Sequence, residues 1–352
     1  MANLKSVLVG CGAIAREHLG ALAELKNVEV AAVCDISAAR AQATAERFAI
    51  ARWFTDFDKM ISEIRPDMVH ITTPPSAHFP LAKTSLDAGL NVLCEKPVAV
   101  EYKDFVALKK LALANHCMLL ENQNLRFHSS IQRIQTLIAT GQLGGVLEVQ
   151  IFLFLNLGGV GSPYVDANAP HPGMALRGGV VGDFLPHIAY LAHIFTGKVL
   201  DVRTIWAKHA VNSPLNADEF RGMIRGERAT AFVDFSGNAQ PNGFWVRVLG
   251  TKMYAEANLF EPPRLTIRRL RAGEPALMSL VDGLAEARDV LKGAVAGFWR
   301  KLAGTSSYDG LPEFIAQVYG SLERREAQPL SLDEIDETAR LVDSFTKPEF
   351  KL

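Results

Sequence analysis

The sequence predicts an α/β domain with a doubly wound parallel sheet over residues 1–123, followed by an α+β domain with a largely antiparallel, open sheet over 124–352. Three observations lead to this prediction. Short apolar runs alternate with amphipathic helical segments throughout the first part, which is typical of a parallel sheet covered by helices. In the second part, strand-like runs follow one another directly. The first run of the chain ends in a glycine-rich turn that opens a helix.

Composition and charge limit the classes of function. The 352 residues suffice for two domains, and 49% of them are hydrophobic against 21% charged, as in soluble globular proteins. The formal net charge of −1 argues against a nucleic-acid partner bound through its phosphates. No apolar run approaches the roughly 20 residues of a membrane span. The best candidate, 146–160, contains Glu148, Gln150 and Asn156, so we expect no integral membrane segment.

The cysteines indicate a reducing compartment. They form no CxxC pair and lie in or beside predicted strands, as buried thiols of cytoplasmic proteins do: Cys11, Cys34, Cys94 and Cys117. The N-terminal apolar run is not read as a signal peptide, because glycines interrupt it and the helix continues past the apparent cleavage site. No spacing of His, Cys and Asp suggests a metal. We expect a cytoplasmic protein with no metal site.

The stretch from Ser6 to Ala15 has the order of elements that a dinucleotide requires. An apolar strand breaks into Gly-x-Gly-x-x-Ala and continues as an amphipathic helix. Gly10 allows the tight turn, and Gly12 lets backbone N–H groups approach the pyrophosphate at the positive end of the helix. Ala13 and Ile14, which open this helix, would lie beside the cofactor. Alone, the pattern also fits an ordinary strand-to-helix turn.

A second predicted strand, 28–34, ends at Asp35, where a Rossmann fold places the acid that accepts the ribose 2′-OH. A carboxylate there would repel a 2′-phosphate, so NAD is favoured over NADP. Asp35 or Ser37 could instead cap the helix 37–48, but the glycine turn upstream favours the ribose role. Arg40 could reach a phosphate and is the residue that would favour NADP.

The alternation continues through strands at 50–54, 68–72, 91–94 and 117–121, with helices at 56–64, 77–88 and 101–114. The carboxyl ends of such strands border the ligand crevice of a doubly wound sheet. We therefore expect the residues that follow these strands to lie beside the cofactor: Thr73, Pro74, His78, Glu95, Lys96 and Asn122.

Three motifs stand at the ends of these strands: Gly10-x-Gly12-x-x-Ala15, Thr73-Pro74-Pro75-x-x-His78 and Gly89-x-x-Val92-x-Cys94-Glu95-Lys96-Pro97. Together they resemble the N-terminal half of the Gfo/Idh/MocA family, NAD(P)-dependent oxidoreductases of sugars, cyclitols and related polyols. The Glu-Lys-Pro triplet is the most specific of the three. The likeness extends through Arg126 and the helix 128–140 to the turn 141–144, which in the family precedes the second domain's sheet.

In the second domain one early helix, about 182–196, interrupts a series of strand-like runs: 146–157, 199–208, 219–225, 229–236, 244–250 and 263–269. The Gly- and Pro-rich segment 158–179 is predicted to be a loop over the substrate. Further candidates for contacts with sugar hydroxyls or a phosphate are Asn122, Arg126, Tyr164 and Arg177.

Asp183 and His187 are four residues apart, so they share one helical face. The resemblance implies that this pair faces the nicotinamide across from Lys96. Histidine suits the general acid/base role because its intrinsic pKa is nearest neutrality. Lys96 would hydrogen-bond the same oxygen, and Asp183 would orient or bind a neighbouring hydroxyl. From this stretch alone, a structural histidine and a helix-capping aspartate are equally good interpretations.

Two departures from the family pattern concern the substrate. The family usually carries a glycine two residues after the aspartate and an acid three after the histidine, whereas here these are Leu185 and Tyr190. Any substrate of a named family member is therefore in doubt. His171, His193 and His209 are predicted to be structural or surface residues.

Three functions remain open from the sequence. The first is an NAD-dependent oxidoreductase of a sugar, nucleotide sugar or cyclitol. The second is an enzyme of the same fold that retains and recycles NAD during net hydrolysis or epimerisation of a sugar. The third, a catalytically silent NAD-binding sensor, ranks last because Lys96 and His187 are both present.

Apolar residues at helical spacing predict an amphipathic helix over 281–302: Leu284, Ala287, Leu291, Val295, Phe298 and Leu302. Because its glycines weaken it, this helix needs a partner surface. Its own domain's sheet, a second subunit and a membrane surface are the alternatives. Among the last two a subunit interface is favoured, because sheets of the resembled family commonly pair across a dimer. We expect a homodimer or homotetramer.

Overall fold

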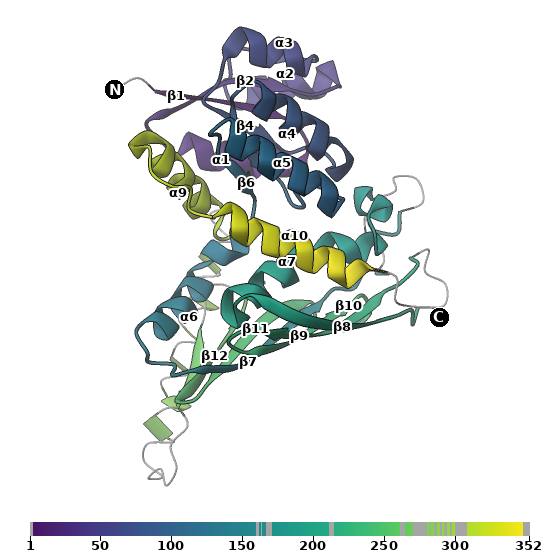
Figure 1. Cartoon of the computed structure of the whole chain (residues 1–352), viewed down its shortest axis with the longest axis vertical. Helices are drawn as coiled ribbons and strands as arrows, with labels where there is room; N and C mark the ends of the chain where they lie inside the picture. Colours follow the sequence, from purple (N-terminus) through teal and green to yellow (C-terminus); the bar gives the residue numbers. More distant parts are fainter. Residues whose placement is uncertain are drawn as a thin grey trace. The chain divides into compact units, whose positions relative to one another are not determined.

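The computed structural model describes residues 3–159, 162, 164–166, 171–210, 215–260, 265–269, 280–281, 283–284, 287–288, 291, 294–295, 298–299 and 308–347. Its contacts divide the chain into two compact units. The first comprises Met1–Asn124 and Gly310–Asp343, and the second comprises Leu125–Asp309 and Ser344–Leu352. Figure 1 shows the chain coloured from purple to yellow along the sequence.

The first unit contains a six-stranded parallel sheet in the order β3-β2-β1-β4-β5-β6. Its strands are β1 Leu4–Val9, β2 Val28–Cys34, β3 Trp53–Phe54, β4 Met68–Ile71, β5 Asn91–Cys94 and β6 Leu119–Glu121. Between them run α1 Ala13–Ala23, α2 Ala38–Arg47, α3 Phe57–Ile64, η1 Pro75–Ala77, α4 His78–Asp87 and α5 Tyr102–Ala114. The central strands are buried on both faces, as their continuous apolar runs predict. The predicted doubly wound α/β fold is confirmed.

Two helices from the end of the chain pack on this first unit: α9 Leu311–Arg324 and α10 Leu332–Thr346 (yellow in Figure 1). Helix α9 lies against α1, and Lys109 of α5 forms ion pairs with Asp333 and Asp336 of α10. The sequence division into 1–123 and 124–352 therefore differs from the structural units. An amphipathic pattern shows that a helix has a buried face but does not show which unit covers it.

The second unit contains a seven-stranded sheet in the order β13-β12-β11-β7-β10-β9-β8. Among the described strands only β7 and β10 pair in parallel, so the predicted largely antiparallel sheet is confirmed. Its strands are β7 Val146–Phe154, β8 Val199–Ala207, β9 Glu219–Gly226, β10 Thr230–Ser236, β11 Gly243–Gly250, β12 Met253–Asn258 and β13 Thr266–Arg269. Helices of this unit include η2 Asn124–Phe127, α6 Ser129–Ala139, η3 Pro172–Ala175 and α7 Gly179–Thr196.

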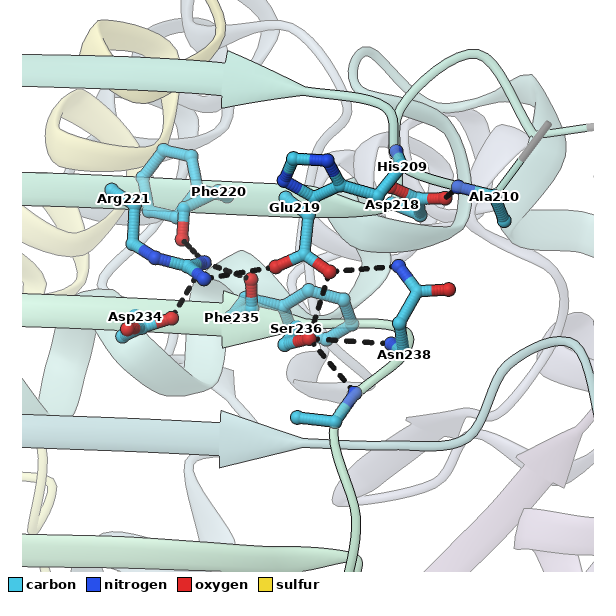
Figure 2. Close-up of polar contacts among 11 residues, drawn as sticks. His209, Ala210, Asp218, Glu219, Phe220, Arg221, Asp234, Phe235, Ser236 and Asn238 are labelled. Carbon is cyan, nitrogen blue, oxygen red and sulfur yellow. Dashed lines mark hydrogen bonds and ion pairs between the residues drawn. The ribbon is translucent and has the colours of Figure 1, made fainter.

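Helix α7 covers one face of this sheet, over β7, β9 and β10 (Figure 1). Phe184 of α7 stacks on Phe235 of β10, with ring centroids 5.5 Å apart. Where β9 begins and β10 ends, a polar network joins the two strands: Figure 2 shows Arg221, Ser236 and Asn238 converging on the carboxylate of Glu219. The contacts of Glu219 with Ser236 and of Arg221 with Asp234 join β9 to β10, so the network stabilises the sheet.

The segment 281–302 is helical wherever it is described, as predicted. Its large apolar side chains that are described are about half exposed or more, which argues against packing on its own domain's sheet: Val281 48%, Leu284 63%, Leu291 66%, Val295 50% and Phe298 60%. Leu302 lies outside the described residues. Over the part of the chain that is described, no helix combines the length and apolar character needed to cross a membrane.

Candidate dinucleotide and substrate site

The glycine turn between β1 and α1 has the geometry of a phosphate-binding loop. Gly10 lies at φ +96°, and a Cβ there would come within 2.7 Å of the backbone at Thr72 and Thr73, so only glycine fits. A Cβ on Gly12 would meet no atom within 4 Å. Gly12 is also the N-cap of α1 and supplies no side-chain acceptor, which leaves the first helical N–H groups for an anion. Ala13 is exposed and Ile14 half-buried beside this turn.

Asp35 follows β2, and two backbone N–H groups orient its carboxylate. Cys11 donates to Oδ2 at 2.8 Å and Ser37 donates to Oδ1 at 2.9 Å. The cap of α2 is Ser37, whose hydroxyl accepts from the backbone N–H of Arg40. Asp35 is therefore not the helix cap, and each of its oxygens keeps a lone pair for a further donor such as a ribose hydroxyl. The side chain of Arg40 is exposed on the first turn of α2.

Three buried polar atoms after β4 and β6 have no hydrogen-bond partner among the described residues: Thr73 Oγ1, Asn122 Oδ1 and Gln123 Oε1. Buried polar atoms are normally satisfied, so an unpaired one at the ligand edge of a sheet fits a site completed by a polar ligand. With the glycine turn and Asp35, these atoms follow four strands of one parallel sheet at its carboxyl edge. The set fits a bound dinucleotide.

His78 has a different place from the one the sequence suggested. It is fully buried, and its two ring nitrogens each lie 2.8 Å from a carbonyl oxygen, one of Thr73 and one of Pro97. Burial lowers the pKa of His78. The ring therefore joins the loop after β4 to the loop after β5, and any effect on a cofactor would be through these loops. Pro74, which follows Thr73 in the loop after β4, is exposed.

Glu95 and Lys96 directly follow β5. The Glu95 carboxylate accepts hydrogen bonds from His18 Nε2 at 2.9 Å, from Asn122 Nδ2 at 2.6 Å and from the Lys96 backbone N–H at 3.3 Å. Burial raises the pKa of Glu95, but the hydrogen bonds from His18 and Asn122 outweigh burial and lower the pKa to about 2. A buried, fixed carboxylate thus lies beside the half-buried Lys96.

In the second unit, Asp183 and His187 are both half-buried on α7. His187 Nδ1 lies 2.7 Å from the hydroxyl of Tyr190, which is fully buried. Tyr190 stands where the resembled family carries an acid, so a neutral hydroxyl orients the imidazole here. Because a hydroxyl can donate or accept, it can match either tautomer of His187. Leu185, the other departure, is fully buried.

Tyr164 and His171 lie near the start of α7. The Tyr164 ring centroid is 4.8 Å from that of His171 and 5.7 Å from that of Phe184. Burial, and then the charge of Asp183, raise the pKa of Tyr164. His171 was predicted to be a structural or surface residue, and the structure places its ring beside that of Tyr164. The remaining candidates are Arg126, half-buried in η2, and Arg177, exposed before α7.

Family models match both parts of the chain. Residues 4–123 match the oxidoreductase family with an NAD-binding Rossmann fold, and residues 131–256 match the GFO/IDH/MocA C-terminal domain. Together the two models cover more than half of the chain. The chain belongs to the Gfo/Idh/MocA oxidoreductase family. The resemblance seen in the sequence is confirmed, and the first unit contains an NAD-binding Rossmann domain.

Family members with similar sequences are sugar and cyclitol dehydrogenases. D-Apiose dehydrogenase of Paraburkholderia graminis is 28% identical over 66% of this chain and 60% of its own length. Inositol 2-dehydrogenase of Salmonella typhimurium is 34% identical over 42% of this chain and 45% of its own. The matches therefore span about half of these relatives' length.

Two solved structures share the fold over nearly the whole chain. An oxidoreductase from Agrobacterium radiobacter in complex with NAD+, L-tartaric acid and magnesium superposes with a TM-score of 0.78 at 18% identity, covering 97% of this chain and 95% of that one. The WlbA dehydrogenase of Bordetella pertussis in complex with NADH and UDP-GlcNAcA gives 0.77 at 20% identity, covering 98% and 94%.

One further residue beside the glycine turn was not predicted from the sequence. Ile36, between Asp35 and Ser37, is 97% exposed. A large apolar side chain exposed next to a polar site is available for contact with an apolar group of a ligand. The sequence contains the signal, because Ile36 is a lone apolar residue after the end of a strand, but only the structure shows that nothing covers it.

Proposed function

We propose that this protein is an NAD-dependent oxidoreductase that transfers a hydride between the nicotinamide and a secondary alcohol or ketone of a sugar, nucleotide sugar or cyclitol. The observation that carries the proposal is Lys96 at the ligand edge of the NAD-binding sheet, next to the buried carboxylate of Glu95. Its relatives' names, apiose and inositol dehydrogenase, support the substrate class. The four cysteines are free thiols, which supports a reducing, cytoplasmic location.

For the dinucleotide, we assign the pyrophosphate to the turn at Gly10 and Gly12 and the adenosine ribose to Asp35. The exposed side chain of Ile36 would then cover one face of the adenine ring. Thr73 Oγ1 and Asn122 Oδ1, which have no partner among the described residues, would meet polar groups near the nicotinamide. The site is thus polar where the phosphates and ribose bind and apolar where the adenine binds.

The chemical step divides between cofactor and protein. A nicotinamide bound at the site would supply the hydride chemistry, as hydride acceptor in the oxidative direction. Lys96 hydrogen-bonds the reacting oxygen and stabilises the negative charge that develops on it. His187 takes the hydroxyl proton at Nε2 while Nδ1–H donates to Tyr190, and in the reductive direction Nε2 returns the proton. Asp183 binds a neighbouring hydroxyl and so orients the substrate.

Polar side chains of the second unit support this substrate class. Tyr164 and His171 pack near Asp183 and offer hydroxyl and imidazole groups, while Arg126 and Arg177 add positive charge in the same unit. Such a set recognises several hydroxyls and an anionic group. A panel of cyclitols, free sugars and sugar nucleotides, followed for NADH formation from NAD+, tests the proposal. No NADH formation from any member would contradict it.

Replacing Asp35 by alanine is expected to reduce the preference for NADH over NADPH. In the unaltered protein the carboxylate accepts from the ribose 2′-OH and repels a 2′-phosphate, so NADH should bind more tightly. One charged hydrogen bond contributes roughly 1.5–3 kcal/mol, so the variant should bind NADH about ten- to a hundredfold more weakly. Fluorescence titration with both cofactors measures this. Tighter NADPH binding by the unaltered protein would refute the ribose assignment.

We also propose that the exposed apolar residues of the helix within 281–302 form a subunit interface. Leu291 and Phe298 are 66% and 60% exposed, and a glutamate at each would place two charges in an apolar contact. The double variant Leu291→Glu, Phe298→Glu should therefore give a smaller particle that still binds NADH. Light scattering measures its mass. An unchanged mass would refute the interface, and liposome co-sedimentation of the native protein would support a membrane surface instead.

A further inference from the structure

A chain of buried side chains leads from Glu95 through the first unit. His18 of α1 contacts Glu95 through Nε2, at 2.9 Å, and His70 of β4 through Nδ1, also at 2.9 Å. His70 Nε2 in turn lies 2.9 Å from the hydroxyl of Tyr319 in α9. The two histidines are fully buried and Tyr319 is 1% exposed. Four residues from four different segments therefore form one continuous hydrogen-bonded series.

Hydrogen-bond chemistry fixes how the protons lie along this series. Glu95 is ionised and can only accept, so His18 must donate to it from Nε2. When both histidines are neutral, His70 donates from Nδ1 to His18, and Tyr319 donates to His70. In the alternative arrangement, both nitrogens of His18 carry a proton. His18 Nδ1 then donates to His70 Nδ1, and His70 Nε2 donates to the Tyr319 oxygen. In both arrangements every nitrogen of the series has a partner.

Each link is therefore required by the next. Removal of the Tyr319 hydroxyl would leave the buried His70 Nε2 without its hydrogen-bond partner. Removal of the His70 side chain would likewise leave His18 Nδ1 without its partner. Burial keeps Tyr319 protonated by raising its pKa, and burial also lowers the pKa of His70. Water does not reach these groups to substitute for a lost partner, since all three side chains are closed off from solvent.

We infer that Tyr319, His70 and His18 are positioning residues that fix the Glu95 carboxylate and, through it, the Lys96 backbone and side chain. The carboxylate is the point where the series meets the site, because Glu95 also accepts from the Lys96 N–H and from Asn122. Helix α9 follows the second unit in the sequence but packs on the first. Through Tyr319, helix α9 thus contributes to the hydrogen-bonded series that ends at Glu95 of the Glu-Lys-Pro motif. The positioning of Glu95 and Lys96 does not depend on the proposed function, whereas the expected effect on kcat rests on it.

The matched pair of variants is Tyr319→Phe and Tyr102→Phe. Both remove one tyrosine hydroxyl from the first unit. Tyr102 donates to Asp336 at 2.8 Å, and no hydrogen bond of the described residues connects it to Glu95. Phenylalanine keeps the ring in each case, so both variants should fold. We expect Tyr319→Phe to lower kcat about three- to tenfold while the KM for NAD changes little. Tyr102→Phe should leave both parameters unchanged.

Two measurements on the cofactor-free protein test the inference without any substrate. Nuclear magnetic resonance of the imidazole N–H groups should show shifted signals for both His70 and His18 in Tyr319→Phe and for neither in Tyr102→Phe. Acylation of lysine amines, mapped by mass spectrometry, should show an altered rate at Lys96 only in Tyr319→Phe, with Lys59 and Lys83 as internal standards.

The outcomes separate this inference from the proposed function. Unchanged His18 signals and an unchanged Lys96 acylation rate in Tyr319→Phe would overturn the positioning role, whatever the enzyme's substrate. Shifted signals and altered acylation in a protein that oxidises no alcohol would support the series and refute the proposed function. Equal kcat values for the two tyrosine variants would also overturn the role in turnover.

Discussion

Replacing Lys96 or His187 by alanine is expected to reduce turnover by about 10²–10⁴-fold while NADH still binds. Each residue acts on the proton or the charge of the reacting oxygen, and a positioned acid or base typically contributes a factor of this size. In barrier terms the loss is about 3–5 kcal/mol. Neither side chain contributes to the glycine turn or to the surroundings of Asp35, so cofactor affinity should change little. Steady-state kinetics and NADH titration of each variant measure the two quantities.

The matched control for the lysine is Lys83→Ala. Lys83 lies in the same unit and pairs with Asp87 one turn along α4, but it is exposed and does not follow a strand of the sheet. An exposed pair of this kind contributes little to stability, so this variant should retain native turnover and native NADH affinity. If Lys96→Ala or His187→Ala kept near-native kcat on the true substrate, the role assigned to that residue would be wrong.

Gly10→Ala is expected to destabilise the fold, whereas Gly12→Ala is expected to weaken dinucleotide binding. At Gly10 the positive φ and a Cβ 2.7 Å from the backbone at Thr72 should together cost about 2–5 kcal/mol of folding free energy. The melting temperature should fall by on the order of 10 °C. At Gly12 the added methyl meets no protein atom within 4 Å but occupies the space that the pyrophosphate needs.

The two glycine variants therefore separate folding from binding. Gly12→Ala should melt close to the native protein, with a loss below about 1 kcal/mol from the poorer N-cap, yet bind NADH at least about tenfold more weakly. Thermal denaturation and NADH titration of both variants measure this difference. Native NADH affinity in Gly12→Ala would mean that the pyrophosphate does not lie at this turn.

The first unit was largely predictable because its signals are local. The strand 91–94 agrees with β5 to the residue, since a short apolar run between turn residues admits few other boundaries. Strand β12 was missed, because its inward residues include Ala255 and Ala257, which give a weak apolar alternation. The positions of α9 and α10 depend on tertiary packing, which periodicity does not report.

The site likewise contains residues that local spacing predicts and contacts that depend on tertiary packing. The glycine turn and Asp35 follow from spacing, because the phosphate and ribose require them at fixed places after two strands. The contact of Tyr190 with His187 was visible only as a departure from the family pattern, not as a hydrogen bond. The link from His70 to Tyr319 joins residues 249 positions apart, so no local pattern could reveal it.

The measurement that tests the central claim most directly follows the hydride itself. The best substrate of the panel is prepared with deuterium on the carbon that bears the reacting hydroxyl, and the cofactor is analysed by mass spectrometry after reaction with NAD+. The account predicts one deuterium in the NADH released, an equal amount of ketone, and the loss of both in Lys96→Ala. A product formed without deuterium in the released NADH would contradict it.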